Sequence, residues 1–293
     1  MRRLRVSRAV IPWIFVAPAV LVMAAGLVRP LGEAAWLSLF EWRLGDLASS
    51  AWTGLGLYAE ALSDPAALGS LLTTAWFSLL VVTTEMVLGV ALALLLERPT
   101  RGIAALRTVF VLPMMIAPIC VGLIWRYLFD TSYGPINQLL QPLGLAQAWL
   151  AEPGLAFAAI VVTDVWQWTP FVFIMALAGL QGLDGAIAEA ARVDGATGWR
   201  LVLWIKLPLI APILLVTLLM RLIDAVRGLE VVYVMTFGGP GRATELFSLH
   251  IYKAAFISQR LGYASALSVI LLLAVAGLTL ALLRLSNPMR TAP

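Results

Sequence analysis

The amino-acid sequence predicts an all-α integral membrane protein with six transmembrane helices. Of its 293 residues 61% are hydrophobic and only 12% are charged, whereas soluble domains carry about 25% charged residues. The mean hydropathy is +0.94, and the hydrophobic residues gather in stretches long enough to cross a bilayer. Helices are expected in these stretches, because an open strand would leave its backbone groups unpaired in lipid.

Six stretches reach or approach the length of about 20 residues that a spanning helix needs. They occupy residues 9–31, 70–96, 107–129, 155–180, 203–228 and 263–284. The first follows a basic N-terminus and resembles a signal peptide. Its length, and its end at Arg29-Pro30 instead of a small-residue cleavage site, predict an uncleaved anchor.

Basic residues fix the expected orientation. They cluster before the first stretch, between the second and third, between the fourth and fifth, and after the sixth. Because such residues accumulate on the cytoplasmic side, both termini are expected in the cytoplasm. The chain then divides into these segments: an N-terminal tail, first helix and external loop at 1–69; a core at 70–285 with a cytoplasmic loop at 182–206 and external loops at 130–154 and 229–262; and a C-terminal tail at 286–293.

Composition and motifs exclude several classes of site. The net charge is +4, but the arginines flank apolar stretches, which indicates membrane topology and not nucleic-acid binding. The single cysteine, Cys120, permits no internal disulfide, and the single histidine, His250, cannot build a metal site alone. The run Gly238-Gly239-Pro240-Gly241 lacks the Lys-Ser/Thr of a phosphate loop. We expect a tight external turn there, and no cofactor, metal or catalytic residue.

The loop at 182–206 holds the most informative motif. Glu189, Arg192 and Asp194 are charged and keep the segment out of lipid. Ala190 and Ala191 are small enough to let another surface approach, and Gly195 can end a helix in the left-handed conformation. The motif predicts a short helix on which another protein docks. The alternative is a solvated loop helix with no partner.

Polar residues at membrane depth form a second pattern. The fourth stretch contains Asp164-Val165-Trp166-Gln167-Trp168, which combines hydrogen-bonding groups with aromatic faces, as sugar sites do. The two tryptophans are two residues apart and cannot share one helical face, so at most one lines a cavity. The alternative interpretation is an interfacial belt or packing between helices.

Three further charged residues lie inside the stretches. Arg221 and Asp224 are three residues apart, which places them on one helical face and predicts an ion pair. Glu85 is the most isolated membrane carboxylate. It could carry a proton in another kind of transporter, but we expect a hydrogen-bonded packing role.

The loop motif resembles the cytoplasmic loop of binding-protein-dependent ABC importer permeases. Glu189-Ala190-Ala191 is followed by Asp194-Gly195-Ala196 and then by Leu207-Pro208. The segments from Val232 to Gly241 and from Ser248 to Phe256 narrow the resemblance to the carbohydrate permeases of the maltose, glycerol-phosphate and polyol type. It covers about 70–285. Phe237 departs from the pattern, since the family more often has glycine there.

The resemblance implies the type I ABC importer permease fold and a multi-pass subunit of a bacterial or archaeal inner membrane. It implies as partners a cytoplasmic ABC ATPase dimer, a second homologous permease, an extracytoplasmic solute-binding protein and a sugar or polyol substrate. The binding protein would contact Gly238 to Gly241. Glu189 would be the charged contact to the ATPase, Ala190 and Ala191 its close-packing face, while Asp194 orders and Gly195 permits the turn.

Two other classes compete with an ATP-driven sugar importer. A secondary transporter driven by an ion gradient would show inverted repeats and paired intramembrane carboxylates. The sequence shows no evident repeat, and Glu85, Asp164 and Asp224 are scattered along it. A structural or signalling membrane subunit would need a sensor domain, which is not visible.

Overall fold

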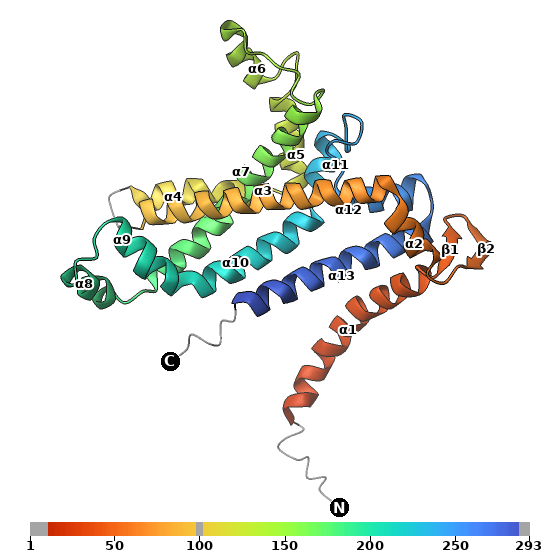
Figure 1. Ribbon diagram of the computed structural model, residues 1–293, viewed down its shortest axis with the longest axis horizontal. Helices are drawn as coiled ribbons and strands as arrows, with labels where there is room; N and C mark the ends of the chain where they lie inside the picture. Colours follow the sequence, from red (N-terminus) through yellow and green to blue (C-terminus); the bar gives the residue numbers. More distant parts are fainter. Residues whose placement is uncertain (1–10, 98–101, 287–293) are drawn as a thin grey trace, which may run out of the picture. The chain divides into compact units, whose positions relative to one another are not determined.

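The structure is a computed structural model that describes residues 11–97 and 102–286. The described chain is mostly helical (Figure 1). It divides into two compact units. One unit comprises Met1–Asp64 and Ile251–Leu273, and the other Pro65–His250 and Ala274–Pro293. Each unit is described by itself below.

The first unit contains α1 (Ile11–Leu37), a β-hairpin, α2 (Gly56–Ser63) and the first half of α13 (Leu261–Ser286). The hairpin pairs β1 (Phe40–Arg43) with β2 (Asp46–Trp52) in antiparallel register. It lies in the predicted external loop 32–69, where no strand was expected. Gly45 has φ +94° and makes the tight reversal between the strands, a conformation that glycine adopts without strain.

Arg260 ties the parts of this unit together. Its guanidinium donates to both carboxylate oxygens of Glu41 at 3.0 Å each and to those of Glu60 at 2.6 and 2.9 Å. The hydrogen bond from Arg260 lowers the pKa of Glu60. The hairpin, α2 and the start of α13 are thereby held by one bidentate cation.

The second unit contains the remaining long helices. They are α3 (Pro65–Leu95), α4 (Ile103–Val111) with η1 (Leu112–Met115), α5 (Pro118–Leu128), α7 (Pro153–Gln181) and α10 (Leu207–Arg227). Short elements connect them: α6 (Pro135–Leu140), η2 (Gln141–Leu143), α8 (Gly185–Val193), α9 (Trp199–Leu201), the π-helical turn η3 (Val202–Lys206), α11 (Glu230–Met235) and the first part of α12 (Phe247–Tyr252). The end of α12 and the π-helical turn η4 (Lys253–Ile257) belong to the first unit.

Five helical stretches of the described chain are long and apolar enough to span a membrane. They are Phe15–Leu37, Pro65–Leu95, Pro153–Gln181, Trp199–Met235 and Leu261–Arg284. The sixth is a bent pair, Ile103–Met115 and Pro118–Leu128, with 97° between its halves. The six-span all-α fold is thus confirmed, and the third span, expected at 107–129, is a broken helix.

The break in the third span has a local cause. Ile116 and Ala117 are extended, with ψ of 134° at both. Pro118 favours this conformation at Ala117, because proline disfavours the helical conformation in the residue before it. Pro118 also has no N–H to continue the ladder. Such a break is tolerated at membrane depth only where protein covers the freed backbone groups.

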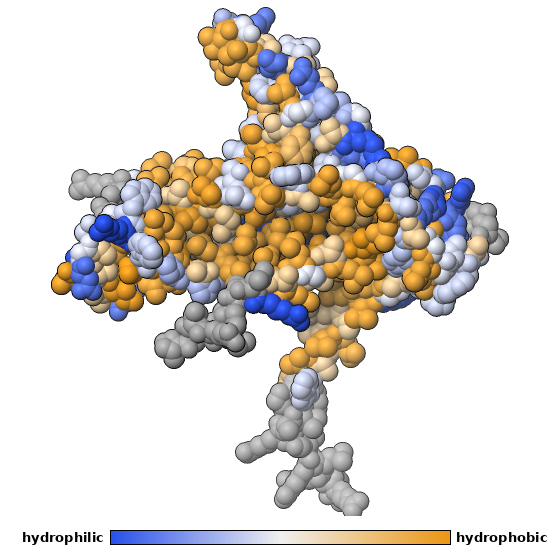
Figure 2. Space-filling view, viewed as in Figure 1, coloured by the Kyte–Doolittle hydropathy of each residue, from blue (hydrophilic) through white to orange (hydrophobic). Residues whose placement is uncertain are grey.

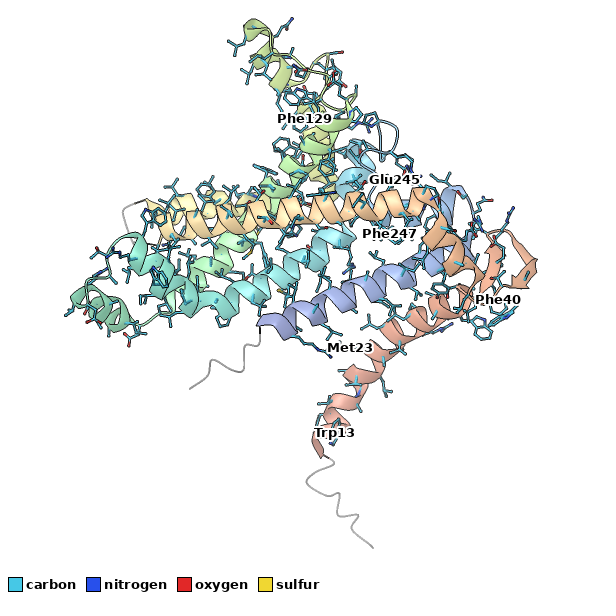
Figure 3. The ribbon with its side chains drawn as sticks, in the orientation of Figure 1. Trp13, Met23, Phe40, Phe129, Glu245 and Phe247 are labelled. Carbon is cyan, nitrogen blue, oxygen red and sulfur yellow. The ribbon has the colours of Figure 1, made fainter. Side chains whose placement is uncertain are left out.

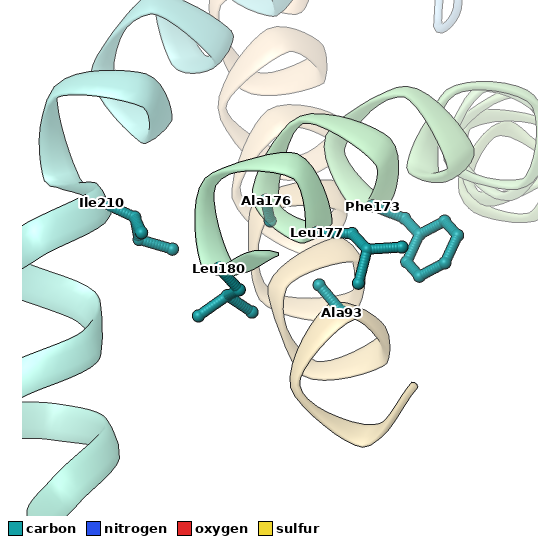
Figure 4. Close-up of a cluster of buried hydrophobic side chains, with 6 residues drawn as sticks. All are labelled: Ala93, Phe173, Ala176, Leu177, Leu180 and Ile210. Atoms are coloured by element: carbon teal, nitrogen blue, oxygen red, sulfur yellow. The ribbon is translucent and has the colours of Figure 1, made fainter. Parts of the chain in front are cut away.

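The core of the second unit lies between α3, α7 and α10. Its buried cluster joins Ala93 of α3 and Ile210 of α10 to a stripe on α7 (Figure 4). The stripe comprises Phe173, Ala176, Leu177 and Leu180. At Gly89 of α3 an added Cβ would lie 2.6 Å from the Cβ of Val172 and 2.9 Å from the backbone nitrogen of Phe173. Glycine therefore permits the backbone approach that membrane helix packing uses.

The long helices expose apolar side chains, and hydrophobic residues dominate their surface in Figure 2. Trp13 and Met23 project from α1 (Figure 3), with 72% and 63% of their surface exposed. Since soluble monomers rarely expose large continuous apolar surfaces, lipid or other membrane subunits are expected to cover these faces.

Candidate functional site

The central polar feature of the second unit is a charge cluster around Arg221 of α10. Arg221 donates from Nε and Nη2 to the two carboxylate oxygens of Glu85 on α3, at 2.7 and 2.9 Å. Nη2 also donates to Asp164 of α7 at 2.9 Å, and Nη1 to Asp224 at 3.2 Å. The predicted pair of Arg221 with Asp224 is confirmed, but Glu85 is the main partner.

Glu85 is therefore not isolated, although its position in the sequence suggested that it was. It is completely buried and serves as a hydrogen-bonded packing residue. Glu85 and Arg221 are 136 positions apart, so no helical spacing could have linked them. Within this cluster, Arg221 joins α3, α7 and α10 through carboxylates that would be costly to bury unpaired.

The cluster forms one wall of a cavity of about 290 Å³. Asp164, Trp168, Arg221 and Asp224 line it, together with Pro118 at the break, the last residue of α10, Arg227, and residues 228–232 beyond it. The Cζ atom of Arg221 lies 4.9 Å from the centroid of the Trp168 ring, a cation–π arrangement. An aromatic face and carboxylate acceptors thus meet in one cavity at membrane depth.

The other two predicted pathway residues lie elsewhere. Trp166 is 39% exposed and packs edge-on against Trp125, with ring centroids 5.6 Å apart. Gln167 is buried, and its Nε2 donates to the carbonyl of Ile116 at 3.0 Å. Its amide therefore holds a backbone group that the break between η1 and α5 frees. No sequence pattern indicated this contact, since it joins residues 51 positions apart.

The predicted loop helix is α8. Its N-cap, Asp184, accepts a hydrogen bond from the backbone N–H of Ala186 at 3.0 Å, which satisfies a free donor of the first turn. At the other end Gly195 has φ +84°, and the N–H of Ala196 donates to the carbonyl of Ala191 at 2.8 Å. This is the left-handed C-terminal turn that the sequence predicts.

The two alanines of the motif differ in exposure. Ala191 is buried against its own chain, whereas Ala190 is exposed. Ala190 lies between Ile187 and Val193 at spacings of three, and Val193 is 88% exposed. Since residues three apart share a helical face, α8 presents an apolar stripe outward, with Glu189 exposed beside it. The stripe was not recognised in the sequence because charged residues dominate the motif.

The run from Phe237 to Gly241 forms a turn that side-chain hydrogen bonds hold in place. Thr244 donates from its hydroxyl to the carbonyl of Gly239 at 2.8 Å and lies 2.7 Å from the Thr236 hydroxyl. Phe237 has φ +51° and Gly238 φ +86°. Phe237 thus has the left-handed conformation that glycine adopts without strain, whereas a side chain costs about 1–2 kcal/mol in that region.

A second polar group supports this turn. Glu245, labelled in Figure 3 with its neighbour Phe247, is buried. It accepts a hydrogen bond from Arg242 at 2.8 Å and pairs with Nδ1 of His250 at 2.9 Å. The N–H of Phe247 donates to the hydroxyl of Thr74 on α3 at 2.7 Å. These bonds fix the turn on α3, so that Gly238 to Gly241 stand at a defined position.

Comparison with known proteins agrees with this architecture. The family model described as the binding-protein-dependent transport system inner membrane component matches residues 85–290. The trehalose/maltose transport system permease protein MalF of Thermococcus litoralis is 33% identical over 97% of this chain and 96% of its own length. The sulfoquinovosyl glycerol transport system permease protein SmoG of Agrobacterium fabrum is 32% identical over 88% of this chain and 84% of its own.

Solved structures share the fold. A chain of the bacterial alginate ABC transporter, in complex with an alginate pentasaccharide-bound periplasmic protein, superposes with a TM-score of 0.84 at 20% identity and covers 97% of this chain and 96% of its own. At that identity the likeness establishes the type I importer fold alone. Fold, family model and curated relatives together show that this chain belongs to the binding-protein-dependent ABC importer permeases, as a multi-pass component of the inner membrane.

Proposed function

We propose that this chain forms half of the translocation pathway of an ATP-driven importer of a sugar or polyol. Its relatives include permeases named for trehalose and maltose, for sulfoquinovosyl glycerol and for sn-glycerol 3-phosphate. A second homologous permease completes the pathway, and an extracytoplasmic binding protein delivers the substrate. The chain contributes no catalytic or nucleotide site, because its sequence lacks the phosphate-loop signature; a cytoplasmic ATPase dimer hydrolyses ATP.

The cavity beside Trp168 carries the carbohydrate assignment. A sugar presents hydroxyl groups around its ring and C–H bonds on its faces. The carboxylates of Asp164 and Asp224 accept hydrogen bonds from hydroxyls, and the Trp168 ring packs against C–H groups. All three residues line the cavity. Trp166 and Gln167 contribute indirectly: Trp166 packs against Trp125, and Gln167 donates to the Ile116 carbonyl.

The α8 helix is the proposed contact with the ATPase. It combines a capped start, a left-handed end and the outward stripe of Ile187, Ala190 and Val193. An exposed apolar stripe is costly in water and favours a protein partner. Glu189 adds a charged contact beside the stripe, and Asp194 with Gly195 sets the turn. This role places α8 and both termini in the cytoplasm and the turn at 237–241 outside, where Gly238, Gly239, Pro240 and Gly241 contact the binding protein.

Substitution of Trp168 tests the pathway. In the assembled transporter, with its ATPase, second permease and binding protein in proteoliposomes, Trp168→Ala is expected to reduce uptake several-fold, since one aromatic contact contributes about 0.5–1.5 kcal/mol. Trp168→Phe should retain more uptake because it keeps an aromatic face. The measurement is ATP-dependent uptake of radiolabelled trehalose, maltose and glycerol 3-phosphate.

Two comparisons make the result decisive. Trp76→Ala removes a 55% exposed indole from α3 outside the cavity and should leave uptake unchanged. Equal uptake by Trp168→Ala and the unmodified complex would refute the proposal that the cavity beside Trp168 belongs to the substrate pathway. Uptake that persists without ATP hydrolysis and collapses with a proton or sodium uncoupler would instead favour the gradient-driven transporter.

A further inference from the structure

Two cations hold the carboxyl end of α3. Lys206 Nζ lies 2.5 Å from Oε2 of Glu97. Arg107 of α4 donates from Nη2 to the backbone carbonyls of Leu96 and Glu97, at 2.5 and 3.2 Å. The side chains of Lys206 and Glu97 are only 16% and 24% exposed. We refer to Glu97, Arg107 and Lys206 as the α3 clasp.

The clasp joins the end of α3 and the nearby α4 to η3, where Lys206 lies 109 positions after Glu97. Lys206 is the last residue of η3, directly before α10, whereas Arg107 precedes the bend of the third span. The end of α3, α4, α8 and α9 gather at one end of the unit in Figure 1. Positive charge at a helix carboxyl end also complements the helix dipole, so both cations stabilise the place where they bind.

A second link joins α3 to α10, the helix that directly follows Lys206. Glu85 on α3 binds Arg221 on α10, and it precedes Glu97 by about 18 Å at a rise of 1.5 Å per residue. Along η3 and α10 the order is reversed: Lys206 at the end of η3 pairs first, and Arg221 on α10 pairs further along. The ion pairs Glu97–Lys206 and Glu85–Arg221 link these antiparallel segments at two levels. Neither segment can therefore rotate about one ion pair while the other stays formed. A displacement of η3 therefore moves α3 and, with it, the charge cluster at the cavity.

The loop itself completes the route. α8 contacts α9, and α9 runs directly into η3, which ends at Lys206. A push on α8 consequently reaches Lys206 through a short, continuous segment. Flexible packing alone would absorb a displacement of α8, whereas the Lys206–Glu97 ion pair, which is little exposed, fixes the distance between η3 and the end of α3.

Resting on the coupling role of α8, we propose that the Lys206–Glu97 pair, braced by Arg107, transmits α8 displacement to α3 and the cavity. Lys206 and Glu97 are positioning residues: they touch neither substrate nor nucleotide. The pair makes the opening of the pathway depend on ATPase closure. Without it, the ATPase still docks and hydrolyses ATP, but less of its movement reaches the cavity.

The test uses charge reversal and a charge swap in the assembled transporter. Variants Glu97→Lys, Lys206→Glu and the double exchange are reconstituted, and trehalose or maltose uptake is divided by ATP hydrolysed. Each single reversal is expected to lower this ratio about fivefold, within the range of coupling between sites. The exchange should restore at least about half of it, as expected of a direct pair in a double-mutant cycle. Arg107 will limit complete recovery because it lies close to position 97.

Controls separate the clasp from folding and from the proposed function. Arg284→Glu reverses a cation near the end of α13, as Lys206→Glu does in the clasp, and should leave the ratio unchanged. Co-purification of the ATPase reports whether α8 still docks. Single reversals that keep uptake per ATP, or an exchange no better than either reversal, overturn the clasp. Failure of the unmodified complex to import any of the sugars with ATP would overturn the proposed function instead.

Discussion

Replacing Arg221 by leucine is expected to prevent stable folding of the second unit. The guanidinium uses four N–H donors on Glu85, Asp164 and Asp224. Its loss leaves Glu85, which is completely buried, with no cation to balance it. Removing one partner of a buried ion pair costs about 3–5 kcal/mol. The measurement is the melting temperature and monodispersity of the purified permease in detergent.

A paired variant separates lost charge balance from lost volume. Glu85→Gln combined with Arg221→Gln removes both charges while keeping polar side chains, so it should be markedly more stable than Arg221→Leu alone. Arg221→Lys keeps the charge but not the bidentate geometry and should fall between them. A melting temperature of Arg221→Leu equal to that of the unmodified protein would contradict the structural role of the cluster.

Gly89→Ala is expected to separate α3 from α7. The added Cβ would lie 2.6 Å from the Cβ of Val172 and 2.9 Å from the backbone nitrogen of Phe173. A backbone atom cannot rotate away, so one helix must shift. Overpacking of this kind costs about 1–3 kcal/mol. It should also reduce uptake, because α3 and α7 carry Glu85 and Asp164 of the charge cluster.

Gly69→Ala is the matched control, since it makes the same change on the same helix. No atom lies within 4 Å of its added Cβ, and alanine favours a helix over glycine by about 1 kcal/mol. Thermal unfolding in detergent should therefore show Gly69→Ala at or above the unmodified protein and Gly89→Ala below it. Equal melting temperatures of the two variants would show that the helices do not approach closely at Gly89.

The sequence was sufficient for the spans and for α8. Hydropathy locates a spanning helix because the bilayer leaves few alternatives, and Gly195 ends α8 through a local conformational preference. The bend at Ile116 and Ala117 was less evident. Pro113 and Pro118 both lie in the third stretch, but prolines alone do not say whether neighbouring helices allow a kink or force a break.

Contacts between distant segments were beyond sequence reasoning. Glu85 meets Arg221, and Gln167 meets Ile116, only after the helices pack. The hairpin was missed although a clue existed: Phe40 and Trp42 alternate before Gly45, which is a strand and turn pattern. In a chain dominated by long apolar helices, a strand of four residues contributes too weak a pattern to stand out.

The most direct measurement of the account cross-links α8 to its partner. In a Cys120→Ser background, Val193→Cys carries a benzophenone-maleimide label and is irradiated in the assembled transporter. Because Val193 is 88% exposed on the apolar stripe, the label should react with the ATPase subunit. Leu139→Cys, 77% exposed on α6, should not. A label at position 193 that reacts with no ATPase, or a cysteine there that a membrane-impermeant reagent modifies from outside intact cells, would contradict the coupling role.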